Sequence, residues 1–301
     1  KNSEGTPEVY NLKRFKNFVL GTPHIKNLNI ISFSNEKDLI KDLLNNSIDQ
    51  ASGLSPENAG DIKDSGYEIH TATLPRIFGM FWNSSSNKVL GDKTVINAFN
   101  KAINRKEIVD KVLSGYGTII QNPIPETMSH DKANEIDAGS LEEASDILEK
   151  GGWKIGADGI RVSGGTKIIT QTKKVGKKTV TQKVTVNGGP VTRLSFSLST
   201  GNTPELKQAS DLIKEQLEKI GAEVTIKVYE TGPLNQLIRA RNYEALFFGQ
   251  IINHESDLFS FWHSSQKTDP GLNIAMYSNK TIDTILETIQ KTLDKPSRDK
   301  K

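Results

Sequence analysis

The sequence of 301 residues contains no cysteine, so disulfide bonds and thiolate metal sites are excluded. No apolar run approaches the roughly 20 residues that a helix needs to span a bilayer. The net charge of +3 is too small to indicate a nucleic-acid partner, and none is expected. What is present, 35% hydrophobic and 25% charged residues, is the composition of a folded protein with a real core.

Catalytic signatures are also missing. The sequence has no G-x-S-x-G elbow, no G-x-x-x-x-G-K-[ST] phosphate loop and no G-x-G-x-x-G fingerprint. His254-Glu255 begins like the zinc motif H-E-x-x-H, but position 258 is Leu, so the second histidine ligand is absent. We therefore expect neither an enzyme nor a resident cofactor or metal.

Both ends of the sequence have features of a fragment. It begins without Met at "KNSEGTPEVY" and stops in the charged stretch "LDKPSRDKK". We expect a piece of a longer chain, so the lack of a targeting signal is uninformative.

The first part of the sequence predicts mixed α/β structure. Alternating patterns indicate strands at 28–33, 47–51, 67–73 and 76–83. Helices are predicted after the capping residues Asn35 and Ser55, and after Ser140, which opens a capping box with Glu143. A single long amphipathic helix is expected over 94–115.

The last third predicts a regular β-α-β-α-β order, with strands near 193–199, 223–230 and 244–250. This order favours parallel strands with right-handed crossovers, and ligands bind beyond the carboxyl ends of such strands. The stretch 247–266, with His254, Glu255, Asp257 and His263, begins in the last of these strands and continues beyond its carboxyl end.

A basic segment interrupts this pattern. Residues 159–204 contain no Asp or Glu but eight Lys and Arg residues, and "TKIITQTKKVGKKTVTQKVTVNGG" alternates β-branched with polar residues. The alternation predicts a hairpin at about 164–190. Its lysines either protect a strand edge from aggregation or contact an anionic membrane or cell-wall surface.

Several blocks together resemble a known family. "PRIFGMFWNSSS", "DKTVINAFNKAINRKEIVDKVLSGYG", "NPIPETM", "EEASDILEKGGWKIGADGI", "DLFSFWHSSQ" and "YSNKTIDTILE" occur in the order found in family 5 extracellular solute-binding proteins. These are the oligopeptide-, dipeptide- and nickel-binding components of ABC importers. Asn104 stands where the family usually has Asp.

The resemblance implies a two-lobed α/β fold of the type II periplasmic-binding-protein class, partial here and carrying the basic hairpin as an insertion. Residues 1–79 would form part of the first ligand-binding lobe and 80–301 most of the second. The protein would be extracytoplasmic, periplasmic or anchored to the membrane at the cell surface, and its N-terminal and C-terminal parts would be missing. It would bind a peptide or other small solute and deliver it to an ABC permease.

The resemblance also suggests where the solute binds. Peptide-binding members hold the ammonium group of the peptide with an Asp on the loop after the "EALFFG" strand. Here that place falls on Ile252 or Asn253, neither of which is charged. Either another acid holds the ammonium group, with Glu255 a candidate, or the ligand is not a peptide with a free amino group. The predicted ligand contacts are Trp82, Asn83, Gln250, Asn253 and His254.

Two alternatives remain open. The same fold could bind nickel or a metal chelate through His254 or His263. The protein could also have lost transport and serve as an adhesion or scaffold protein that uses the basic hairpin.

Overall fold

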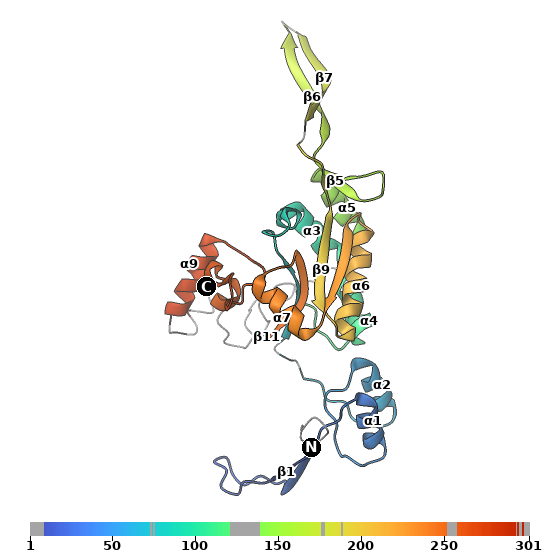
Figure 1. Cartoon of the computed structure of the whole chain (residues 1–301), viewed down its shortest axis with the longest axis vertical. Helices are drawn as coiled ribbons and strands as arrows, with labels where there is room; N and C mark the ends of the chain where they lie inside the picture. The colour runs from blue at the N-terminus through green and yellow to red at the C-terminus, as the bar shows by residue number, and fades with distance from the viewer. Residues whose placement is uncertain are drawn as a thin grey trace. The chain divides into compact units, whose positions relative to one another are not determined.

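The computed structural model of the chain describes residues 9–72, 76–120, 139–175, 178–187, 189–251 and 258–292, with residues 74, 294 and 297 (Figure 1). The chain forms two compact units, Lys1–Thr71 and Ala72–Lys301. The boundary expected at 79/80 lies inside strand β3 (Arg76–Trp82), which pairs along its whole length with a strand of the second unit. The boundary between lobes expected at 79/80 stays a prediction, as does the assignment of the units to ligand-binding lobes.

The first unit contains a hairpin and two short helices. Strands β1 (Val9–Lys13) and β2 (Asn27–Ile31) pair antiparallel, and every residue of both is exposed. Helix α1 (Glu36–Leu44) begins at Asn35, whose Oδ1 accepts the backbone N–H of Asp38 at 2.9 Å. Helix α2 (Pro56–Asp64) begins at Ser55, as predicted.

Two predicted strands of the first unit do not form. Residues 47–51 and 67–72 are irregular. An alternating pattern of apolar and polar residues is not sufficient for a strand, because the backbone must also form hydrogen bonds with a neighbouring strand. Tyr67 instead anchors its segment by donating its hydroxyl to the backbone O of Leu43 at 2.7 Å.

A four-stranded sheet organises the second unit. Its order is β10-β9-β11-β3, with β9 (Ser195–Gly201), β10 (Glu223–Tyr229) and β11 (Ala245–Ile251) parallel and β3 antiparallel to β11. Helices α6 (Pro204–Glu218) and α7 (Thr231–Ala240) connect the parallel strands, as the sequence predicts. The mixed α/β fold class is confirmed.

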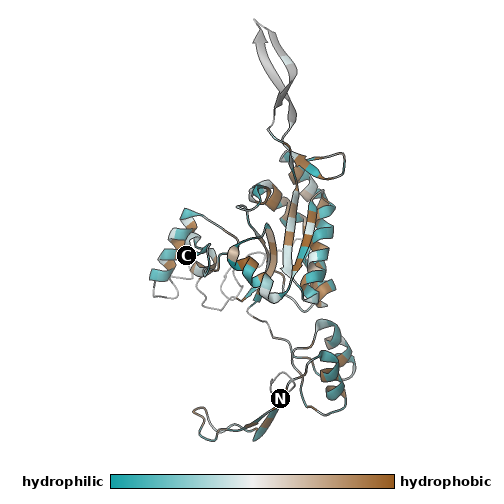
Figure 2. Cartoon of the chain, in the orientation of Figure 1, coloured by the Kyte–Doolittle hydropathy of each residue, from teal (hydrophilic) through white to brown (hydrophobic). Residues whose placement is uncertain are grey.

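Helices cover both faces of this sheet. On one face, the main hydrophobic cluster joins Phe196, Leu198 and Val224 to residues of α6, α3 (Lys93–Ala102) and α5 (Leu141–Lys150). On the other face, a smaller cluster joins Phe81 and Leu246 to residues of α7. In Figure 2 the hydrophobic residues of this unit concentrate on the strands and on the helix sides turned towards them.

The single helix expected over 94–115 is two helices, α3 and α4 (Arg105–Leu113). The chain leaves the helical conformation at Ile103 and Asn104, both of which have extended backbone angles. The Oδ1 atom of Asn104 then accepts the backbone N–H of Glu107 at 3.0 Å. Asn104 is therefore the N-cap of a new helix, a role that Asp performs equally well.

The basic hairpin forms as predicted. Strands β6 (Thr166–Val175) and β7 (Lys178–Asn187) pair antiparallel and make a two-stranded sheet of their own. They emerge from a small antiparallel sheet of β4 (Lys154–Ile155), β5 (Arg161–Ser163) and β8 (Thr192–Arg193).

The remaining elements are short or lie near the end of the chain. They are η1 (Lys88–Gly91), α8 (Leu258–Trp262), η2 (Ser264–Gln266) and α9 (Lys280–Lys291). Within the described residues, no helix combines the length and the apolar composition needed to cross a membrane.

Candidate ligand-binding site

The carboxyl ends of the parallel strands are the first place to look for ligand-binding groups. Asn202, just after β9, donates its Nδ2 hydrogen to Oε2 of Glu230, just after β10, at 2.5 Å. Gln250, near the end of β11, donates its Nε2 hydrogen to the backbone O of Leu272 at 3.3 Å. The neighbouring Ile251 is 60% exposed. This end of the sheet therefore offers amides and a carboxylate beside an apolar side chain.

Close packing shapes the same end of the sheet. A Cβ atom at Gly249 would lie 2.7 Å from Cε1 of Phe78, so a side chain there would have to displace that ring. Phe78 is itself 46% exposed, and the guanidinium carbon of Arg76 lies 5.9 Å from its ring centre. The ends of β3 and β11 thus present an aromatic surface with a cation beside it.

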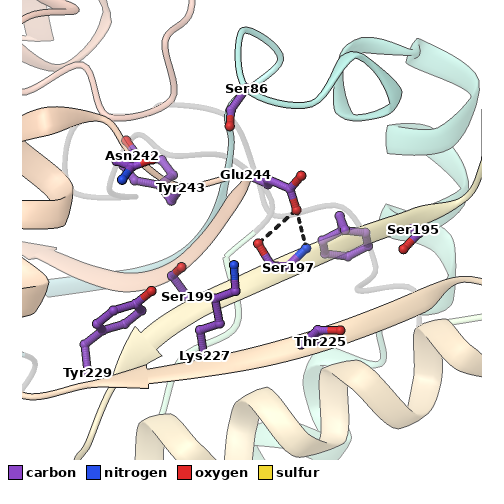
Figure 3. A pocket seen from close by; sticks show the side chains of 11 residues that line it. Ser86, Ser195, Ser197, Ser199, Thr225, Lys227, Tyr229, Asn242, Tyr243 and Glu244 are labelled. Atoms are coloured by element: carbon purple, nitrogen blue, oxygen red, sulfur yellow. Dashed lines mark hydrogen bonds between the residues drawn. The ribbon is translucent and has the colours of Figure 1, made fainter.

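A polar groove of about 380 Å³ lies elsewhere on the sheet, beside β9 and β10 (Figure 3). Figure 3 shows Ser197 and Ser199 on one strand and Lys227 and Tyr229 on its neighbour, with Glu244 reaching Ser197 from outside these strands. The groove is lined by Ser86, Ser195, Phe196, Ser197, Ser199, Thr225, Lys227, Tyr229, Asn242, Tyr243 and Glu244.

Glu244 completes the hydrogen bonding at one end of this groove. The pairing of β11 with β9 begins only at Ala245 and Leu198, so the backbone N–H of Ser197 has no ladder partner there. An Oε2 atom of Glu244 accepts that N–H at 2.5 Å and the Ser197 hydroxyl at 2.9 Å. The other carboxylate oxygen accepts from Nδ2 of Asn87 at 3.2 Å. These contacts make Glu244 a structural acceptor that extends the sheet.

Tyr243, the next residue along the groove wall, is buried. Its hydroxyl donates to the backbone O of Ile274 at 2.5 Å. Burial raises the pKa of Tyr243 to about 12, although the positive charge of Arg241 acts in the opposite direction. The tyrosine therefore stays neutral and acts as a hydrogen-bond donor over the whole physiological range.

Asn83 occupies a structural position at the end of β3. Its Nδ2 atom donates to the backbone O atoms of Arg241 and Tyr243 at 3.0 and 2.9 Å. Its Oδ1 atom accepts the backbone N–H groups of Ser85 and Ser86 at 3.1 and 3.3 Å. The side chain is almost fully buried, and its donors and acceptor are occupied. The predicted ligand contact finds no support in these bonds.

Trp82 packs into the main core. Its ring centre lies 5.5 Å from that of Phe99 and 5.8 Å from that of Phe196, in tilted and edge-on arrangements typical of aromatic clusters. These contacts account for the ring without a ligand. Of the five predicted contacts, Gln250 stands at the carboxyl end of the sheet, while Asn253 and His254 lie outside the described residues.

His263 has a structural role next to α9. Its Nδ1 atom accepts the backbone N–H of Ser265 at 3.1 Å, which caps η2. Its ring stacks on Phe259 with 4.1 Å between centres. The Nε2 atom lies 3.6 Å from a carboxylate oxygen of Glu287. In the part of the chain that the structure describes, no group of three or more His, Cys, Asp or Glu residues is arranged to hold a metal ion.

The sequence analysis did not single out the polar groove, although a signal was present. Ser195, Ser197 and Ser199 alternate with Phe196 and Leu198 in β9. Small polar residues at every second position indicate a strand face that is not packed beneath an apolar layer. Glu244 and Tyr243 could not have been found in this way, because their contacts lie far away in the sequence.

Comparison with known proteins identifies the family to which the chain is related. The family model of bacterial extracellular solute-binding proteins, family 5, middle region, matches residues 3–271. The oligopeptide-binding protein AppA of Bacillus subtilis is 28% identical over 223 residues, which cover 71% of this chain and 36% of AppA. The nickel-binding protein NikA of Staphylococcus aureus is 18% identical over 289 residues, covering 95% of this chain and 51% of NikA.

Solved structures show the same fold. AppA from Bacillus subtilis in complex with a nonapeptide superposes with a TM-score of 0.66 at 21% identity, covering 97% of this chain and 54% of that one. NikZ from Campylobacter jejuni in complex with Ni(L-His) gives a TM-score of 0.68 at the same identity and coverage. This chain therefore spans between a third and about half of the length of these proteins. Because the family model covers most of the sequence, the resemblance seen in its motifs is confirmed: this chain belongs to the family 5 bacterial extracellular solute-binding proteins.

Proposed function

We propose that the protein containing this chain captures a small extracellular solute and delivers it to an ABC permease. An oligopeptide is the first candidate for this solute. The observation that carries the proposal is the family match over residues 3–271. The similarity to the oligopeptide-binding protein AppA over 71% of the chain supports peptides as the solute class.

Binding without chemical conversion suits the groups at the carboxyl end of the sheet. Gln250 and Asn202 supply amides, Glu230 supplies a carboxylate, and Phe78 and Ile251 supply exposed apolar surface. Extended peptides are recognised largely through hydrogen bonds to their backbone, with apolar surface for their side chains. These groups provide both kinds of contact, and they lie where α/β sheets bind ligands.

Native mass spectrometry of the full-length protein, purified from cell extract, tests the proposal. The expected result is a mass above that of the denatured protein, and the excess fragments into peptides. An excess that yields no amino acids on fragmentation would contradict peptide binding. A protein that carries no excess mass and gains none in a peptide mixture would contradict solute capture altogether.

Nickel, alone or as a chelate, is the second candidate. It is supported by the similarity to the nickel-binding protein NikA over 95% of the chain. A metal that arrives with its own organic ligands needs few from the protein, so it places less demand on His254 and His263. Titration with nickel, and separately with nickel and free histidine, tests this candidate. Saturable binding supports it, and a flat titration in both cases removes it.

The partner and the location follow from the same proposal. The permease would receive the loaded protein on the outer side of the membrane, where the protein would be periplasmic or membrane-anchored. The second predicted partner, an anionic surface contacted by the Lys-rich hairpin, depends on the hairpin and not on the solute site.

A further inference from the structure

The hairpin of β6 and β7 is a two-stranded ribbon attached to the rest of its unit through β5 and β8. Among the described strands, β6 and β7 pair only with each other. Figure 1 draws the ribbon extending beyond β5, away from the helices of the second unit. A two-stranded ribbon has two faces and is at best marginally stable in water when neither face is covered. A partner that covers one face of this ribbon would therefore stabilise it.

Charge is the first indication of a partner. Residues 159–204 contain no Asp or Glu, and five lysines lie within the two strands. Lysines on strand edges also discourage sheet-to-sheet aggregation. That explanation accounts for positive charge in general, but it predicts no difference between the two faces of the ribbon.

The pairing register shows that the two faces do differ. Directly paired residues share a face, and Ile169 pairs with Val184 while Thr172 pairs with Thr181. One face, here called the valine face, contains five apolar β-branched residues and three lysines. Its members are Lys167, Ile169, Gln171, Lys173, Val175, Lys178, Val180, Gln182, Val184 and Val186. The opposite face contains Thr166, Ile168, Thr170, Thr172, Lys174, Thr179, Thr181, Lys183, Thr185 and Asn187.

We propose that the valine face of this hairpin docks on the surface of an anionic lipid bilayer. A bilayer interface offers both parts of what this face requires, namely negative headgroups for lysines and an apolar layer for valine and isoleucine. A polyanionic polymer or a nucleic acid satisfies the lysines alone and leaves the five apolar residues in water. The hairpin thus holds the protein close to the membrane, whatever solute the protein carries.

Sedimentation of the full chain with phospholipid vesicles tests the docking. The chain is expected to bind vesicles of 30% phosphatidylglycerol and 70% phosphatidylcholine at low salt, and not vesicles of phosphatidylcholine alone. The variant K167Q/K173Q/K178Q should bind at least about a hundredfold more weakly, because each lysine near an anionic surface contributes to partitioning. Absence of binding to the anionic vesicles overturns the proposal.

The choice of face requires its own pair of variants. The double variant V180T/V184T, here called the valine-face variant, keeps β-branched residues at both strand positions and removes two apolar groups from the valine face. The matched control, I168T, removes one apolar group from the opposite face. The valine-face variant should reduce binding about tenfold or more, since each buried methyl group contributes to partitioning, while the control stays within about twofold. Equal effects would contradict docking through the valine face.

The lack of cysteine allows a direct readout of the contact. Single variants Val184→Cys and Thr185→Cys place a thiol-linked fluorophore on neighbouring positions of opposite faces. On anionic vesicles, the label at 184 is expected to shift to the blue and resist aqueous quenchers, while the label at 185 stays in water. Binding without any shift at 184 would show a purely electrostatic contact, such as one with a polyanionic polymer, and would overturn docking on lipid.

Discussion

Tyr243 combines a position on the wall of the polar groove with a hydroxyl that is bonded to the backbone O of Ile274 at 2.5 Å. Burial raises its pKa from 10.0 to about 12. In the unfolded chain the same phenol ionises near pH 10, so the unfolded state loses its proton first as the pH rises. The stabilisation that comes from keeping this group neutral is therefore complete below pH 10 and is lost between pH 10 and 12.

Tyr243→Phe is expected to remove this dependence. The two-unit difference in pKa corresponds to about 2–3 kcal/mol of the free energy of unfolding. Wild type should lose this amount relative to the variant between pH 10 and 12. Near pH 7 the variant should be less stable by about 1 kcal/mol, because it lacks the hydrogen bond to Ile274. Urea unfolding at a series of pH values measures both effects, and parallel stability curves for the two proteins would contradict the pH argument.

Arg161 is a cation enclosed by acceptors. Its guanidinium donates to the backbone O atoms of Ile220 and Trp153 at 2.8 and 2.7 Å, and to Oε2 of Glu149 at 2.9 Å. The side chain is only 6% exposed. Arg161→Met should lower the free energy of unfolding by about 3 kcal/mol, because it leaves buried carbonyl groups without donors.

Arg193 provides the matched control for this substitution. It also bonds a carboxylate, that of Asp158 at 2.6 Å, but 44% of its side chain is exposed. Water can replace the lost partner there, so Arg193→Met should lower the free energy of unfolding, measured by chemical denaturation, much less than Arg161→Met does. Equal losses from both variants would show that the carbonyl acceptors around Arg161 contribute little.

Asn253 lies outside the described residues, so its prediction depends on the family alignment alone. If Asn253 stands where peptide-binding relatives hold the ammonium group, Asn253→Asp should supply the missing anion. The expected result in calorimetry is tighter binding of peptides with a free amino terminus and no gain for N-acetylated peptides. Equal changes for both kinds of peptide would reject this alignment.

At the scale of elements, the side chain of Asn104 caps the helix that follows the break between α3 and α4. Asn104→Ala removes the acceptor for the backbone N–H of Glu107 and should cost about 1 kcal/mol of stability. Asn104→Asp keeps the acceptor and should be close to neutral. Thermal unfolding of the three proteins tests this. An alanine variant as stable as wild type would mean that the N-cap contributes nothing to the stability of α4.

The elements that the sequence predicted well are those set by local rules. Ser140 caps α5 by accepting the backbone N–H of Glu143 at 3.1 Å, and the alternation of β-branched with polar residues predicted the β6–β7 hairpin. The errors occurred where a local pattern continued through a change of structure. The apolar stripe runs through Ile103, yet the capping preference of Asn104 ends one helix and begins another. Residues 47–51 and 67–72 alternate but pair with none of the strands that the structure describes.

At the scale of the whole molecule, sequence periodicity predicts parallel strands but not which strands are neighbours. The sheet order places β3 next to β11, although more than 160 residues separate Trp82 from its partner Ala245. The same long-range contacts decide that Trp82 and Asn83 belong to the core and to a backbone network. Motif resemblance could identify the family, because it preserves the order of local blocks, but it could not assign roles to these two side chains.

The two units should differ in their ability to fold alone. Both hydrophobic clusters of the second unit are built from its own residues, between Phe81 and Ile274. The first unit buries only Leu43, Ala59 and Ile62 among its described hydrophobic residues, and its strands β1 and β2 are exposed throughout. A domain of about 70 residues needs a larger core than this to be stable by itself.

We therefore expect residues 72–301, expressed alone, to unfold cooperatively in urea and to protect the amides of β9 and β11 from hydrogen exchange. Residues 1–71 alone should show no cooperative transition, because too little apolar surface is buried to offset the loss of chain entropy. Circular dichroism and hydrogen exchange on both pieces measure this difference. A cooperative first unit, or a second unit without protected strands, would mean that the buried clusters of each unit do not determine its stability.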